Sequence, residues 1–128
     1  MNKQAALKSY NHVHVNAGVE SASSHRLIEM MFEGLLARLA QAKGAMQQKD
    51  MELKGQKISS AISIVLGLKD SLDVEKGGEV AVNLDALYDY IQRTLWQANI
   101  KNDQSLIDEC GQLVSQISSA WREMGKSM

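Results

Sequence analysis

The chain contains no proline, a single cysteine and few aromatic residues, which make up 5% of its 128 positions. Proline is the residue that most often interrupts helices, so its absence favours long, unbroken ones. One cysteine excludes a disulfide within the chain. Because Cys110 stands between Ile107 and Leu113 at helical spacing, we expect a buried thiol that behaves as a small apolar side chain.

Strong charge and long apolar runs are also missing. The chain has 14 Lys and Arg against 15 Asp and Glu, for a net charge of −1, and no basic block, which argues against nucleic-acid binding. Its apolar runs are only a few residues long, far short of the roughly 20 that cross a bilayer. The N-terminus lacks the basic start and apolar core of a signal peptide. We therefore expect a cytoplasmic protein without membrane insertion.

Catalytic and metal-binding motifs are absent as well. The three histidines, His12, His14 and His25, precede the main helices or stand at the start of the first, so no base is placed beside a nucleophile. None follows a glutamate by three residues, as a di-metal bundle requires. His12 and His14 offer only two ligands, and no glycine-rich phosphate loop occurs. The expectation is a protein that is not an enzyme and has no cofactor or metal.

Apolar spacings of three and four residues predict an all-α protein, an antiparallel up-down four-helix bundle formed by residues 21–128 of one domain. Within residues 1–20 a short helix is expected, followed by an extended stretch. The first helix is expected to begin at a cap formed by Ser23, and the second to span about residues 51–72. The Gly77-Gly78 pair forms the turn beyond the second helix, and Asp103 caps the last one. The predicted core residues are Ile28, Met31, Phe32, Leu35, Leu39, Ala42 and Met46 in the first helix, Ile58, Ile62, Val65, Leu66 and Leu72 in the second, Val80, Leu84, Leu87, Tyr88, Ile91 and Leu95 in the third, and Leu106, Cys110, Leu113, Val114, Ile117, Trp121 and Met124 in the last.

Two of these helices carry more apolar residues than a bundle needs. In the second, Leu53, Ile64 and Leu68 fall roughly 180° to 240° from Ile62, and together with Ala61 they form an outer stripe. In the third, the outward residues are Val82, Tyr90 and Trp96. Exposed apolar patches mark partner sites, and Trp and Tyr dominate many interfaces. The sequence thus predicts a binding surface on the second and third helices.

Three linked motifs between residues 72 and 103 carry a family resemblance. They are Leu72-Asp73 with Gly77-Gly78-Glu79, then Asn83, Leu84, Leu87, Tyr88 and Tyr90, then Ala98, Asn99, Asn102 and Asp103. In this order they resemble the flagellar export chaperone family FliS. The likeness extends to Tyr10, to the helix start at Ser21 to Ile28 and to Gln41 to Lys43, so it covers nearly the whole chain.

The resemblance implies a chaperone that binds the disordered C-terminal segment of flagellin, prevents premature polymerisation and presents it to the export gate protein FlhA. A regulatory partner such as the anti-sigma factor FlgM is also implied, and the N-terminal segment with Tyr10 corresponds to the mobile cap of the family. The client-binding residues expected are Tyr10, Ile64, Leu68, Tyr90, Trp96, Asn99 and Ile100. Leu84, Leu87 and Tyr88 are expected in the core.

Two alternatives come from other classes. One is a self-associating helical adaptor whose outer apolar stripe meets its own copy, which also allows a homodimer of the client-free chaperone. The other is a phosphorelay transfer bundle, which needs an exposed histidine in the middle of a helix. His25 stands instead in the first turn of its predicted helix, which argues against this second alternative.

Overall fold

The computed structural model describes residues 23–126, and within them the chain forms four helices and no strand. They are α2 (Ser24–Gln47), α3 (Met51–Asp70), α4 (Val74–Lys101) and α5 (Gln104–Lys126). The predicted all-α bundle is confirmed, whereas the expected cap with Tyr10 lies outside the described residues. None of the four helices combines the length and the apolar character that a membrane span requires.

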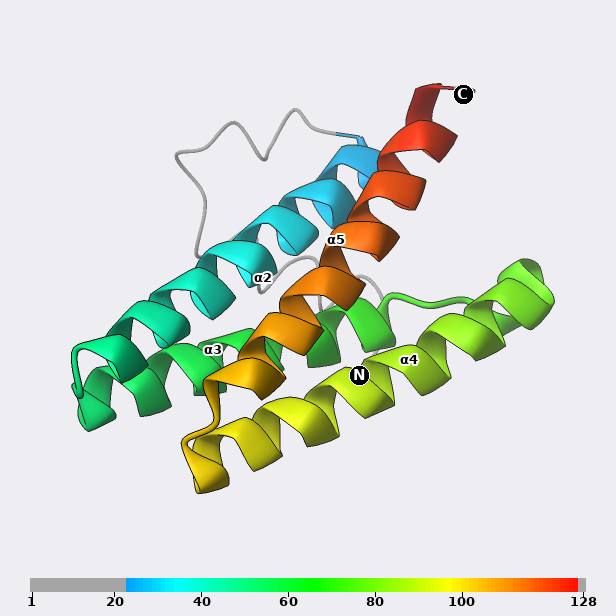
Figure 1. Cartoon of the computed structure of the whole chain (residues 1–128). Coiled ribbons are helices and arrows are strands. Elements are labelled where there is room, and N and C mark those ends of the chain that lie inside the picture. Colours follow the sequence, from blue (N-terminus) through cyan, green and yellow to red (C-terminus); the bar gives the residue numbers. More distant parts are fainter. Residues whose placement is uncertain (1–22, 127–128) are drawn as a thin grey trace.

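Short polar residues start each helix. Ser23, Asp50 and Asp73 each accept a hydrogen bond of 3.1 Å from the backbone N–H three residues later. Asp103 precedes α5 and accepts a hydrogen bond of 2.9 Å from the backbone N–H of Ser105, two residues later. Connections of two or three residues then force successive helices to run antiparallel. The helices contact one another in the cyclic order α2, α3, α4, α5 (Figure 1).

The core along α2 agrees with its prediction, because all seven residues of the predicted stripe are buried.

Cys110 of α5 is buried as well, with its Sγ 3.8 Å from the carbonyl oxygen of Ile91. Burial raises the pKa of the Cys110 thiol to about 12, so this thiol stays protonated near neutral pH. Tyr88 is core as expected, and burial likewise raises the pKa of its phenol.

The predicted orientation of α3 is wrong. The buried stripe consists of Lys54, Ile58, Ala61, Val65 and Leu68, spaced alternately by four and three residues. Ala61 and Leu68, expected on the outer stripe, are fully buried, and Leu66, expected in the core, is 42% exposed. Because α3 is apolar around most of its circumference, periodicity alone leaves its rotation open. Lys54 hides the true stripe, since a charged residue at its first position makes it look polar.

The N-terminal end of α4 departs from the prediction for a different reason. Gly78 has φ 54° and ψ −131°, a conformation that only glycine adopts readily, so it separates the first turn from the rest of α4. The predicted Gly77-Gly78 turn is therefore a break inside the helix. Val80, expected in the core, is 64% exposed beside this break. At the far end of α5, the predicted core residue Met124 is 55% exposed.

The first turn of α2 is joined to the last turns of α5 by Trp121. Its Nε1–H donates to the carbonyl oxygen of His25 at 2.9 Å, and the two rings stack with centroids 4.5 Å apart and an interplanar angle of 5°. Phe32 meets the same indole edge-on at 6.4 Å. This contact closes the ring of four helices at the end opposite the α4–α5 turn.

Two glycines of α5 should respond in opposite ways to alanine. A Cβ at Gly111 would meet nothing within 4 Å, so Gly111→Ala should raise the free energy of unfolding by about 0.5 to 1 kcal/mol through helix propensity. A Cβ at Gly125 would lie 2.4 Å from His25 Nε2, so Gly125→Ala should displace the His25–Trp121 stack and lower stability. Thermal unfolding followed by circular dichroism measures both. A lower melting temperature for Gly111→Ala would show that this position is not open.

Candidate partner-binding site

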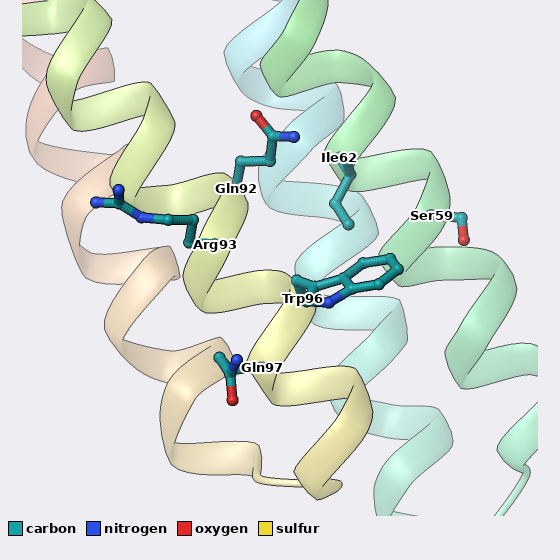
Figure 2. A pocket seen from close by; sticks show the side chains of 6 residues that line it. All are labelled: Ser59, Ile62, Gln92, Arg93, Trp96 and Gln97. Carbon is teal, nitrogen blue, oxygen red and sulfur yellow. The ribbon is translucent and has the colours of Figure 1, made fainter.

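A groove of about 500 Å³ lies between α3 and α4. Its lining residues are Ser59 and Ile62 from α3 and Gln92, Arg93, Trp96 and Gln97 from α4 (Figure 2). Polar side chains thus surround an apolar floor made by Ile62 and Trp96. This composition, apolar at the centre and polar at the edge, is that of a protein-binding surface.

Trp96 is the largest apolar side chain of the groove and is 60% exposed. Its ring reaches across from α4 toward α3 and Ile62 (Figure 2). Within residues 23–126 the indole N–H has no hydrogen-bond partner. Tryptophan is one of the residues enriched among those that contribute most to binding at protein interfaces.

More apolar surface continues from the groove. Ile100, one turn after Trp96 on α4, is 64% exposed, and Leu66 of α3 is 42% exposed. Ile62 and Leu66 were both predicted in the core. Ile62 does pack against the core, but it is half-buried and also lines the groove, whereas Leu66 is a surface residue that the sequence missed. Their signal was present in the spacing Ser59, Ile62, Leu66, which follows one flank of the helix.

Four of the predicted client-binding residues do not join this surface as free side chains, namely Leu68, Ile64, Tyr90 and Asn99. Leu68 is fully buried, as described above, and is corrected to a core residue. Ile64 is half-buried and packs against the core. On the helical wheel Ile64 and Ile62 fall on opposite flanks of the buried stripe, each roughly 80° from it, so Ile64 faces away from the groove.

Tyr90 lies on the other side of α4, toward α5. It is 40% exposed, and its hydroxyl donates a hydrogen bond to the Glu109 carboxylate, which raises the pKa of the phenol. A smaller groove of about 240 Å³ opens there, lined by Tyr90, Arg93, Thr94, Gln97, Lys101, Leu106 and Glu109. Arg93 and Gln97 therefore border both grooves, and α4 forms the ridge between them.

Asn99 is half-buried and is already engaged through its backbone. The ammonium group of the buried Lys54 donates to the Asn99 carbonyl oxygen and to Asn102 Oδ1, each at 3.2 Å. Asn102 has φ 52° and ends α4 in the left-handed conformation. A cation at the C-terminal end of a helix is favoured by the helix dipole. Lys54 thus holds the last turn of α4, which carries Ile100. The sequence did not predict this contact of Lys54.

Lys54→Ala should lower the free energy of unfolding by about 1 to 3 kcal/mol, because it removes two hydrogen bonds that a charged donor makes to the half-buried Asn99 and the exposed Asn102 at the end of α4. Amide hydrogen exchange should also accelerate in the last turn of α4. Lys57→Ala is the matched control, since Lys57 has no hydrogen bond or ion pair within residues 23–126. Equal stability for the two variants would show that the Lys54 contacts contribute nothing.

Salt bridges tie α3 to α4 beside the groove. Lys69 Nζ lies 2.8 Å from Asp85 Oδ1 and 3.1 Å from Asp89 Oδ1, and the hydrogen bond that the ammonium donates to Asp85 is the main reason that the pKa of Lys69 is raised. Arg93, one turn further along α4, is exposed and forms no ion pair with any described residue. The groove therefore has one cation that remains available to a partner.

Comparisons with known proteins all point to one family. A family model described as Flagellar protein FliS matches residues 6–128 of the chain. Flagellar secretion chaperone FliSB of Pseudomonas aeruginosa is 47% identical over 116 residues, which cover 91% of this chain and 92% of that protein. Flagellar secretion chaperone FliS of Salmonella typhimurium is 46% identical over 121 residues, or 94% and 90%. The FliS of Vibrio cholerae is 36% identical over 121 residues, or 94% and 89%.

Proposed function

The chain belongs to the FliS family of flagellar secretion chaperones, and on this basis we propose that it binds the C-terminal segment of flagellin in the cytoplasm and holds it until export. The exposed Trp96 over the α3–α4 groove is the observation that supports this role most directly. An otherwise disordered client segment needs such a preformed apolar surface in order to fold against it.

The recognition mode that fits the groove is a helix laid along it. An amphipathic client helix would place apolar side chains on Ile62 and Trp96 and continue over Ile100, while its polar face remains in water. Ordering a disordered tail costs several kcal/mol of the gross interaction free energy. A rigid chaperone surface lowers the entropy cost of binding on the chaperone side. The Lys54 contacts supply such rigidity at the end of α4.

The proposed holding function follows from the apolar flagellin surface that binding covers. While the C-terminal segment of flagellin lies on the chaperone, its apolar face cannot pair with other flagellin subunits, so filament assembly in the cytoplasm is prevented.

We propose that the export gate protein FlhA receives the loaded complex. A pull-down with the cytosolic part of FlhA should retain the loaded complex and leave the free chaperone in solution, and equal retention of both would contradict selective delivery.

Isothermal titration with a peptide covering the last helical segment of flagellin from the same organism tests the central proposal. The expected result is saturable one-to-one binding with a strongly negative heat-capacity change, which is the mark of buried apolar surface. A gain of helical circular dichroism on mixing should accompany it. Absence of binding at tens of micromolar peptide, judged by heat at two temperatures and by circular dichroism, would contradict this client.

A further inference from the structure

The smaller groove, between α4 and α5, carries an excess of positive charge. Arg93 and Lys101 both line it, against one acidic residue, Glu109, among the described residues of its wall. Glu109 already accepts the hydrogen bond of the Tyr90 hydroxyl. Because the whole chain is nearly neutral, with 14 basic and 15 acidic side chains, this excess is local. We call the part of the groove lined by Arg93, Gln97 and Lys101 the basic subsite.

The two cations of the basic subsite have no carboxylate of their own. Arg93 forms no ion pair with any described residue, as noted above, and the same holds for the exposed Lys101. Asp103 follows Lys101 by two residues, but its carboxylate accepts hydrogen bonds from the hydroxyl and the backbone N–H of Ser105. These bonds are the main reason that the pKa of Asp103 is lowered, and the charge of Lys101 is a lesser one. Both cations are therefore available to a partner.

The spacing of the basic subsite lets both cations reach one group. Arg93, Gln97 and Lys101 follow one another at intervals of four residues, so the two cations start about 12 Å apart along the helix axis, with the amide of Gln97 between them. In Figure 2 the side chains of Arg93 and Gln97 lie on the other side of the α4 ribbon from the Trp96 ring. A guanidinium group matches a carboxylate with two parallel N–H donors, and a lysine adds a mobile point charge. A carboxylate is thus the ligand that these side chains fit.

We propose that the basic subsite binds a carboxylate of the flagellin segment whose apolar residues lie on Trp96. This inference rests on the proposed function and adds a charge requirement to it. Arg93 and Gln97 line both grooves, so a segment that lies over Trp96 passes directly beside them. One carboxylate would also neutralise the α4–α5 groove, which has two cations and one acid. The carboxylate belongs either to an Asp or Glu side chain of the segment or to its C-terminus.

Removing both cations tests the basic subsite by calorimetric titration with a peptide of the flagellin C-terminal segment that keeps its free C-terminus. Arg93→Gln with Lys101→Gln should weaken binding about tenfold, and raising the salt from about 0.05 to about 0.5 M should weaken wild type more than this variant. The matched control is Lys57→Gln with Arg122→Gln. These two residues line no described groove and form no ion pair with a described residue, so the same change in net charge should leave binding at the wild-type level.

Two altered peptides distinguish the sources of the carboxylate. One has an amidated C-terminus, and the other has each Asp and Glu replaced by its amide. The peptide that lacks the bound carboxylate should bind wild type about tenfold more weakly and should lose little further affinity on the double variant, since the two changes remove the same contact.

The possible failures separate the basic subsite from the client. Equal affinity of wild type and the double variant for the unaltered peptide, or an equal loss in the control, would overturn the subsite and leave flagellin binding in place. Full affinity of wild type for both altered peptides would also overturn it. A wild-type chain that binds none of the peptides would overturn the client and the subsite together. Circular dichroism checks that each variant remains folded.

Discussion

Trp96→Ala should weaken binding of the flagellin C-terminal peptide by about 30-fold or more, the usual effect of removing an interface anchor. Its thermal stability should change little, because the side chain is 60% exposed and contributes little to the core. The two effects separate a binding role from a packing role. Titration calorimetry measures the first, and thermal unfolding of the same preparation measures the second.

The control for Trp96→Ala is Val80→Ala. Val80 is 64% exposed on the same helix, but it does not line the groove, so its loss removes exposed apolar surface without removing an anchor. Binding should stay at the wild-type level. If Trp96→Ala bound the peptide as tightly as wild type, the groove would not be the client site, and a large fall in its melting temperature would identify Trp96 as a packing residue.

Leu68→Ala should lower the free energy of unfolding by about 2 to 5 kcal/mol, as truncation of a fully buried leucine does. Leu68 is 0% exposed and belongs to the buried stripe that faces the other helices from α3. Its removal leaves a cavity in a closely packed interior that cannot collapse to fill it. Urea unfolding of the variant and the wild type at constant temperature measures the difference in their free energies of unfolding.

Leu66→Ala makes the same chemical change two residues away and should lower stability by less than about 1 kcal/mol, because Leu66 is 42% exposed. The pair therefore tests the rotation of α3 independently of any client. Comparable losses in the two variants, or a larger loss at Leu66, would mean that the buried stripe runs along the other flank of the helix.

The accuracy of the prediction follows how apolar residues are distributed around each helix. In α2 they occupy one face, so a spacing of three and four residues determines which side is buried, and the whole stripe from Ile28 to Met46 is confirmed. In α3 they occupy more than half of the circumference, so spacing alone does not determine whether Leu66 or Leu68 is buried. The deciding contact is made by Lys54, whose partners lie 45 and 48 residues away. Sequence spacing within one helix cannot reveal such a contact.

The candidate site was predictable to a similar degree. Trp96 and Ile100 were expected on the surface and are exposed there, because the core stripe of α4 from Leu84 to Ala98 is well separated from them on the helix. Their binding of a client stays a prediction, as do the roles of Tyr10, Tyr90 and Asn99. On α3, Leu66 was misplaced for the same reason as Leu68. Ile62 packs against the core as predicted, but its second role in lining the groove was not predicted.

The burial of Cys110 has a practical consequence for anyone who wishes to follow this protein in solution. It is the single cysteine of the chain, it is fully buried, and its thiol pKa of about 12 leaves almost no thiolate near neutral pH. Maleimide reagents should therefore not react with Cys110 in the folded chain. A second cysteine introduced at the exposed Gln97 would then be the only group to accept a fluorophore, with no need to remove the native one.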